Sequence, residues 1–293
     1  MRRCRIESLA VSPPRRGLFR WGSLKHAVAA GRRCLRQTKY HAEDVRVLVN
    51  AGIHRDGHTC EPAIAAYIQH GLGINVEFQG RRTLAFDLLN GACGMLNAAH
   101  VVAALLQAGD AQVGMVVSSE ANGDVDPDPA YTWPASGAAA ILDVSPRSGV
   151  GFGAFAFETH EQHAALFSSV VSLATKHGRI LVRRAAELED AWLEHAGAAV
   201  ETVLAADRLT RAEIDVVVPA QISPRFLERL PERIGLPRAK VVDLTGKLPD
   251  THSTSTFLAL HELIASGRAT TGTRALLLSF GSGITVGAAS YRF

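Results

Sequence analysis

The sequence predicts an α/β fold with five layers, α-β-α-β-α, built from two duplicated βαβαβ halves. Strand-like and helix-like segments alternate along the chain, and their order in the first half repeats in the second. The expected strands are short and almost wholly apolar, which is typical of parallel strands covered on both faces. With 293 residues, 47% of them hydrophobic, the chain can bury a core of this size.

The two halves have matching elements. In the first half we expect, in chain order, a helix ending in residues 35–42, a strand at 45–51, a helix at 62–72, a strand at 84–89, a helix at 95–108 and a strand at 113–118. In the second half we expect a helix at 191–206, a strand at 216–220, a helix at 224–234, a strand at 241–244, a helix at 254–265 and a strand at 275–280.

The boundary between the halves is expected near residue 150. A strand at 149–157 and a helix or loop at 160–174 lie between the two copies. We therefore expect an N-terminal half at residues 1–150 and a C-terminal half of the same α/β type at residues 151–293. The helices at 95–108 and 254–265 carry few charges, so we expect them to be buried between the two sheets.

The charge pattern excludes several classes of function. The net charge is +3, from 31 basic and 28 acidic residues mixed along the chain, so we expect no nucleic-acid partner. No segment approaches about 20 continuous apolar residues, so we expect no membrane span and a cytoplasmic protein. We expect a solvated, partly flexible N-terminal end without a signal peptide. This expectation rests on a group of arginines, namely Arg2, Arg3, Arg5, Arg15 and Arg16.

Cysteines and histidines form no familiar ligand pattern in the sequence. The four cysteines, Cys4, Cys34, Cys60 and Cys93, include no CxxC pair, so we expect reduced thiols rather than disulfides or a zinc site. The twelve histidines include no HExxH or comparable spacing. We therefore expect no metal and no cofactor.

Two turns at the starts of the buried helices carry the candidate catalytic residues. In a parallel α/β unit such turns gather at the carboxyl ends of the strands, where ligands bind. The first turn contains Cys93, and its counterpart in the second half contains Asp250 and His252. If the halves pack by pseudo-twofold symmetry, the turns face each other. A cysteine beside a base is what an acyl transferase that forms a thioester requires.

Each of these residues also has a structural interpretation. A cysteine in a turn of small residues is often an inert buried thiol, although the N–H groups at a helix start can lower the pKa of Cys93. A lone histidine such as His252 is often a hydrogen-bonded structural residue. The sequence alone leaves both alternatives open.

A glycine-rich loop follows the last expected strand, at residues 279–284. It has neither the Lys-Ser/Thr of a P-loop nor a GxGxxG pattern, so it is weak evidence for phosphate binding. Glycines let a main chain approach a reacting carbonyl closely. We therefore expect the backbone N–H groups of Cys93, Ser282 and Gly283 to stabilise an oxyanion.

Four segments resemble ketoacyl-ACP synthase III-like proteins of the thiolase superfamily, in the order in which that family has them. Residues 86–97 resemble the nucleophile region, and residues 280–287 with the closing residues 291–293 resemble the Gly-Gly-Gly-Phe motif and the final Arg-Phe. Residues 215–221 resemble the Val-Pro-His-Gln-Ala-Asn segment, and residues 249–251 the Gly-Asn-Thr segment. The resemblance implies a divergent member with the thiolase fold.

The resemblance also implies a Cys-His-Asn catalytic set, in which the cysteine takes the acyl group and the other two assist decarboxylative condensation. A gapless match places Ala92, Ala220 and Asp250 at these three positions. Cys93 lies one residue later, a rotation of about 100° at a helix start. A carboxylate at Asp250 opposes the enolate charge of condensation. It resembles the change in relatives that transfer acyl groups to hydroxyl or amine acceptors. The remaining catalytic candidates are Cys93 as nucleophile, with His252 and Asp250 in support.

Two functions are compatible with this resemblance. One is an acyltransferase or condensing enzyme of fatty-acid, polyketide or other secondary metabolism, acting on an acyl carrier protein or acyl-CoA thioester. The N-terminal half is shorter than in the family, in a segment that relatives use to bind CoA, which weakens the case for acyl-CoA. The other function is that of a non-catalytic subunit in a heterodimer with an active ketosynthase paralogue. Because the family is dimeric, we expect a homodimer or a heterodimer.

Overall fold

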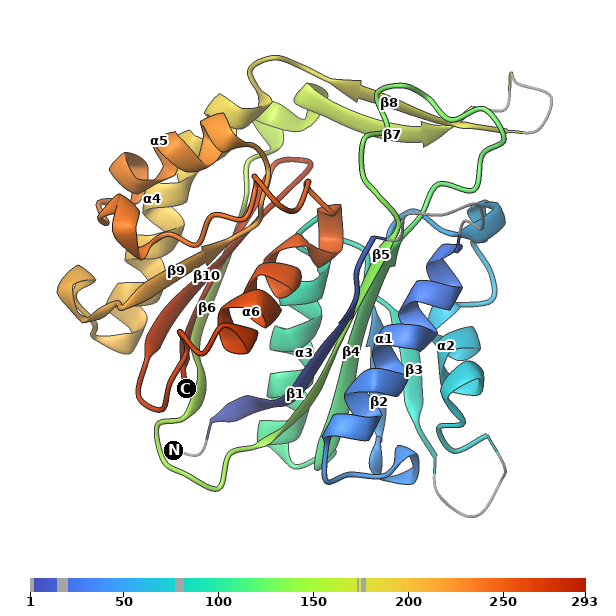
Figure 1. Ribbon diagram of the computed structural model, residues 1–293, viewed down its shortest axis with the longest axis horizontal. Coiled ribbons are helices and arrows are strands. Elements are labelled where there is room, and N and C mark those ends of the chain that lie inside the picture. Colours follow the sequence, from blue (N-terminus) through green and yellow to red (C-terminus); the bar gives the residue numbers. More distant parts are fainter. Residues whose placement is uncertain (1–2, 15–20, 77–81, 173, 175–177) are drawn as a thin grey trace.

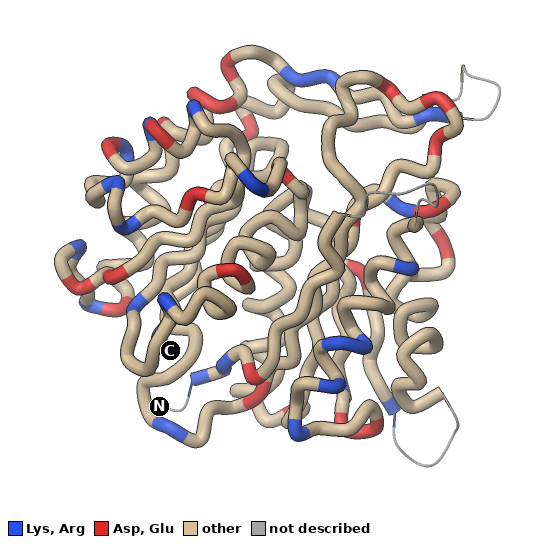
Figure 2. The backbone as a smooth tube through the Cα atoms, in the orientation of Figure 1, with Lys and Arg blue, Asp and Glu red and all other residues tan. Residues whose placement is uncertain are grey.

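The computed structural model describes residues 3–14, 21–76, 82–172, 174 and 178–293. These residues form five layers, with helices on the two outer faces, two larger sheets, and a pair of helices between the sheets (Figure 1). Basic and acidic positions are interspersed along the described chain (Figure 2). The five-layered architecture expected from the repeat is therefore present.

In the described residues, five strands form the first sheet, in the order β1-β5-β4-β2-β3. They are β1 (Cys4–Ser12), β2 (Val47–Asn50), β3 (Leu84–Asp87), β4 (Val113–Glu120) and β5 (Ser136–Val144). Helices α1 (Ser23–Gln37) and α2 (Ile64–Leu72) cover its outer face, because their apolar sides pack on β2, β4 and β5 in one core cluster.

The second sheet has the order β6-β11-β10-β9 in the described chain. Its strands are β6 (Gly151–Thr159), β9 (Val216–Pro219), β10 (Arg274–Gly281) and β11 (Thr285–Arg292). Helices α4 (Leu188–Asp207) and α5 (Pro224–Ile234) cover its outer face. The start of α5 follows from its sequence, because the Ser223 hydroxyl accepts a hydrogen bond from the Phe226 N–H at 3.0 Å and proline occupies the first helical position.

Helices α3 (Gly94–Ala108) and α6 (Ser255–Ala265) form the middle layer (Figure 1). Both belong to a core cluster that also contains side chains of the two sheets. The window Gly91–Ala108 is long and apolar enough, by composition, to span a membrane. Its burial between two sheets gives these apolar side chains partners inside the protein, as in the core helix of a globular domain.

A separate hairpin of β7 (Phe167–Val171) and β8 (Ile180–Arg184) lies at one end of the two larger sheets (Figure 1). Backbone N–H groups of β8 donate to two carboxylates of the segment between β4 and β5, Ile180 to Asp124 at 2.9 Å and Val182 to Asp128 at 3.0 Å. A small apolar cluster around Trp133 packs beneath it. The hairpin is therefore attached to the segment between β4 and β5.

The N-terminal prediction is wrong for the described residues. Residues 4–12 form the edge strand β1, which pairs antiparallel with β5. Arg5, expected in a solvated end, makes two hydrogen bonds with the Asp143 carboxylate, at 2.8 and 3.1 Å. The Ile6 N–H donates to the Tyr291 hydroxyl at 3.1 Å. Of the other arginines in that prediction, Arg2, Arg15 and Arg16 lie outside the described residues.

The sheets are mixed rather than wholly parallel. β2 pairs parallel with β3 and β4, and β9 with β10, but β5 and β11 run antiparallel to their neighbours. These two strands follow tight or irregular connections rather than helices, so the alternation rule missed them. The strand expected at 241–244 is a single bridge between Val241 and Val217. The expected half-boundary at residue 150 falls in the connection between β5 and β6.

Candidate active site

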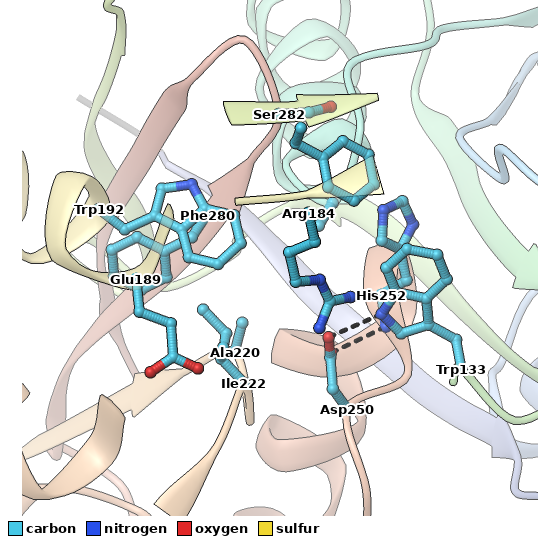
Figure 3. Close-up of a pocket in the computed structure, with 12 residues that line it drawn as sticks. Trp133, Arg184, Glu189, Trp192, Ala220, Ile222, Asp250, His252, Phe280 and Ser282 are labelled. Atoms are coloured by element: carbon cyan, nitrogen blue, oxygen red, sulfur yellow. Dashed lines mark hydrogen bonds between the residues drawn. The ribbon is translucent and has the colours of Figure 1, made fainter. Parts of the chain in front are cut away.

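A central cavity lies where the turns before α3 and α6 meet (Figure 3). Its empty space, counted together with the open solvent at its edge, is about 480 Å³. Its lining residues come from both halves and from the hairpin, and they are Ala92, Trp133, Phe167, Arg184, Glu189, Trp192, Ala220, Ile222, Asp250, His252, Phe280 and Ser282. The two pseudo-equivalent turns are therefore brought together, as the repeat predicted.

The three positions matched to the family's catalytic set all line this cavity. They are Ala92 at the start of α3, Ala220 after β9 and Asp250 before α6. Alanine has no group that can attack a carbonyl or move a proton. Two of the three positions therefore contribute only shape.

Cys93 does not line the cavity, which contradicts its predicted place beside His252. It is fully buried, and its thiol donates to the Thr285 carbonyl at 3.4 Å on the side of the second sheet. Burial raises the pKa of Cys93 to about 12, because desolvation outweighs the hydrogen bonds to the thiol. The one-residue shift has thus turned the side chain away from the cavity, and the thiol has the character of an inert buried cysteine.

The predicted oxyanion donors are only partly available. The Cys93 N–H donates to the Asn90 carbonyl at 3.1 Å, so it does not point into the cavity as a free donor. Ser282 lines the cavity, and it packs on Gly91, whose positive φ of 50° suits glycine. The roles of the Ser282 and Gly283 amides remain predictions.

Cysteine reactivity tests this placement. At pH 8 we expect iodoacetamide to modify the exposed Cys60 in the native protein and to spare the three buried thiols, Cys4, Cys34 and Cys93. A pKa near 12 leaves on the order of one thiol in 10⁴ ionised at this pH. Ala92→Cys in a Cys60→Ser background should gain a labelled thiol, as read by peptide mass spectrometry. Labelling of native Cys93 as fast as Cys60 would contradict the placement.

Glu120, at the end of β4, is the centre of a buried polar network. Its carboxylate accepts hydrogen bonds from His54 Nδ1 at 2.6 Å, His252 Nδ1 at 3.2 Å, the backbone N–H groups of Ile53 at 3.2 Å and His54 at 3.0 Å, and the Ser253 hydroxyl. Burial favours a raised pKa for Glu120, but the electrostatic attraction to the two imidazoles and the hydrogen bonds from them outweigh burial and lower the pKa. Glu120 is therefore an anion that orients both imidazoles.

His252 links this network to the cavity. Its Nδ1 atom donates to Glu120, while its ring lines the cavity. In the described residues, its hydrogen bonds to Asp250 and Glu120 are made by the backbone N–H and by Nδ1, and neither uses Nε2. The residue has a positive φ of 55°, an uncommon conformation for a side chain of this size and one often found at functional sites. A carboxylate on one imidazole nitrogen fixes the tautomer that leaves the other nitrogen free to accept a proton.

Asp250 accepts two hydrogen bonds, from Trp133 Nε1 at 2.9 Å and from the His252 backbone N–H at 2.9 Å (Figure 3). Burial raises its pKa, and the neighbouring donors and Arg184 only partly offset that effect. The guanidinium of Arg184 lies over the Trp133 ring, 5.1 Å from its centroid, and points toward Asp250 in Figure 3. Asp250 therefore fixes the indole and the His252 turn.

Four residues of this arrangement were missed from the sequence, namely His54, Glu120, Trp133 and Arg184. A signal for two of them exists. His54 follows β2 and Glu120 ends β4, so both lie at the carboxyl edge of neighbouring parallel strands, where ligands bind. Trp133 and Arg184 come from the loop and hairpin, whose position no periodicity indicates.

The structure also brings together side chains of metal-ligand type, which the spacing search did not find. One group is His54, Glu120 and His252, whose ligand atoms lie within 4.8 Å of one another. In this group the Glu120 carboxylate already accepts hydrogen bonds from the Nδ1 atoms of both histidines. The geometry therefore fits a proton-sharing network better than a metal centre. The other group joins the segment after β6 to α4 and is described below.

Comparison with known proteins finds relatives among the beta-ketoacyl-(acyl-carrier-protein) synthases III. Residues 204–293 match the family model of the C-terminal part of 3-oxoacyl-(acyl-carrier-protein) synthase III. A beta-ketoacyl-(acyl-carrier-protein) synthase III 2 of Deinococcus radiodurans is 30% identical over 240 residues, which is 79% of this chain and 69% of the relative. The beta-ketoacyl-(acyl-carrier-protein) synthase III of Acidiphilium cryptum is 28% identical over 249 residues, 79% of this chain and 72% of the relative.

Solved structures share the fold over nearly the whole chain. The beta-ketoacyl-(acyl-carrier-protein) synthase III from Thermus thermophilus has a TM-score of 0.84 at 24% identity, covering 99% of both chains. OleA from Xanthomonas campestris, in crystals with lauric acid and lauroyl-CoA, has a TM-score of 0.86 at 18% identity, again over 99% of both chains. The fold is the thiolase fold, and the chain belongs to the beta-ketoacyl-(acyl-carrier-protein) synthase III family.

Proposed function

We propose that the chain is an acyltransferase that passes an acyl group from a carrier-protein or CoA thioester directly to a small acceptor, without an acyl-enzyme on Cys93. The observation that carries this proposal is the Glu120–His252 pair, whose imidazole lines the cavity beside the matched catalytic positions Ala92 and Ala220. His252 acts as general base, and Glu120 is its positioning residue.

The proposed step needs no group beyond donor, acceptor and His252. The acceptor X–H attacks the thioester carbon while His252 Nε2 takes its proton, which gives a tetrahedral oxyanion. The oxyanion collapses, the carbon–sulfur bond breaks, and the departing thiolate receives the proton from His252. The backbone N–H groups of Ser282 and Gly283 are the proposed donors to the oxyanion.

Acyl transfer is favoured over carbon–carbon condensation by the state of Asp250. Both of its carboxylate oxygens accept hydrogen bonds, so in this arrangement the side chain offers no donor to an enolate. Ala220 offers none either. An alcohol, an amine or water is therefore the proposed acceptor. We place this reaction in the cytoplasm, in fatty-acid, polyketide or other secondary metabolism.

The experiment is a transfer assay with purified protein, acyl-CoA and acyl-carrier-protein donors of several chain lengths, and alcohol, amine and water acceptors. Liquid chromatography with mass spectrometry should detect acylated or hydrolysed product. The Cys93→Ala variant should retain the wild-type rate within a few-fold, and intact-protein mass spectra should show no acyl adduct. An adduct that Cys93→Ala removes would refute direct transfer.

A second candidate is a non-catalytic subunit paired with an active ketosynthase paralogue. It is favoured by the alanines at two matched catalytic positions and by the described edge strand β3, where Leu84 in the strand and Leu89 after it are each 57% exposed. An apolar edge of this kind needs a covering partner, which is another copy or a paralogue. If the transfer assay gives product only after a co-expressed paralogue is added, this candidate replaces the first.

A further inference from the structure

A cluster of histidines joins the segment after β6 to helix α4, away from the Glu120 network. His163 lies in the short 3₁₀ helix η3 (Glu161–Leu166), and Glu194 and His195 lie on α4. One ligand atom from each of these three residues lies within 4.8 Å of the other two. His160, which precedes η3, stacks on His195 with ring centroids 3.5 Å apart.

Two atoms of this cluster have unmet bonding capacity. The Nε2 atoms of His160 and His195 are buried and have no hydrogen-bond partner in the described chain. The nearest carboxylate to His160 Nε2 is that of Glu158, at 3.9 Å, which is beyond hydrogen-bond range. A buried polar atom without a partner is unfavourable. Stacking two such rings thus suggests that the cluster has a function beyond packing.

We propose that His163, Glu194 and His195 bind one divalent transition-metal ion of the Zn²⁺ type. Two imidazoles and one carboxylate are the donor set that suits zinc, nickel and copper rather than magnesium or calcium. Tetrahedral zinc holds its ligand atoms about 3.4 Å apart, so small rotations of the exposed Glu194 and the half-buried His163 close the site. Water fills the fourth position, and His160 packs against the His195 ring.

The segments that carry the site are hydrogen-bonded to the 281–284 loop, in which Ser282 lines the central cavity. The backbone of His160 pairs with Ile284, through N–H to carbonyl bonds of 2.8 and 3.1 Å. Trp192, one turn before His195 on α4, donates from Nε1 to the Gly281 carbonyl at 2.9 Å. A metal ion that joins η3 to α4 therefore holds the 281–284 loop from both sides.

Isothermal titration of tag-free, EDTA-treated protein tests the site. We expect about one equivalent of Zn²⁺ to bind, no binding of Mg²⁺, and visible absorption of a four-coordinate ion when Co²⁺ is used instead. His163→Ala and Glu194→Gln should each weaken Zn²⁺ binding by at least about 100-fold, because each removes one of three protein ligands. Circular dichroism should show both variants folded, since neither side chain is buried.

The control variant is His261→Ala, which removes a partly exposed histidine on α6 that is next to a glutamate but outside the cluster. It should bind Zn²⁺ like the wild type. Unchanged Zn²⁺ binding in His163→Ala and Glu194→Gln would overturn the proposal and assign the metal elsewhere, for example to His54, Glu120 and His252. Failure of the wild type to bind Zn²⁺ or Co²⁺ would overturn it as well. Neither result bears on acyl transfer.

Discussion

Replacing Glu120 by alanine should destabilise the protein by about 3–5 kcal/mol, measured as a shift of the urea midpoint at unchanged slope. The carboxylate is completely buried and accepts five hydrogen bonds, so its removal takes the acceptor from the donors of His54, His252 and Ile53. The Ser253 hydroxyl also bonds to the Ser118 hydroxyl at 2.6 Å and keeps that partner. This is the largest effect on stability that we expect from one substitution in the site.

The control for this prediction is Glu228→Ala on the exposed side of α5, which should change stability by no more than about 0.5 kcal/mol. The lowered pKa of Glu120 adds a pH dependence. Its contribution is complete above the ordinary carboxyl pKa of 4.5 and is lost as the pH falls through the lower folded value, so the gap between wild type and Glu120→Gln should narrow in acid. Equal stability of Glu120→Ala and Glu228→Ala would contradict the network.

The second large effect concerns rate. His252→Asn should lower acyl transfer by about 10²–10⁴-fold, because the side chain can no longer accept a proton from the acceptor. Asparagine is chosen because it tolerates the positive φ of 55° at this position better than alanine does. Its amide can still donate to Glu120, so the carboxylate is not left unpaired. The rate is measured under saturating donor and acceptor.

The matched variant is His54→Asn, which changes the other imidazole on Glu120. His54 does not line the central cavity, so its loss should lower stability but reduce the rate by less than about tenfold. Equal rate losses in the two variants would show that the network acts only by holding the structure. A wild-type rate in His252→Asn would exclude His252 as the base.

The repeat made the architecture predictable because apolar strands and helices leave a periodic pattern that does not depend on partners. The helices at 62–72, 95–108 and 224–234 lie within two residues of α2, α3 and α5. Strand β1 could not be found in this way. Its arginine at position 5 is paired across the sheet with Asp143, a contact that no local pattern shows.

The location of the site was predictable from the sequence, whereas the identity and orientation of its side chains were less so. Placing both turns at the carboxyl ends of strands located Ala92, Asp250 and His252 at one cavity. The direction of the Cys93 side chain depends on a shift of one residue at the N-terminus of α3, and the sequence does not determine how the turn accommodates that shift. Glu120 was missed because the sequence pattern of an acidic residue at the end of a strand is typical of a solvated side chain. Its burial depends on donors from segments that are distant in the sequence.

The β7–β8 hairpin contributes side chains to the central cavity but forms no part of the two larger sheets. It brings Phe167 and Arg184 to the central cavity and places the Ser169 hydroxyl 3.1 Å from His54 Nε2. Yet it forms its own two-stranded sheet, attached through Asp124 and Asp128. Substitutions in the hairpin can therefore change the shape and charge of the cavity lining while the two larger sheets and their helices stay unchanged. Selection for a new substrate can therefore act on the hairpin without changing the rest of the fold.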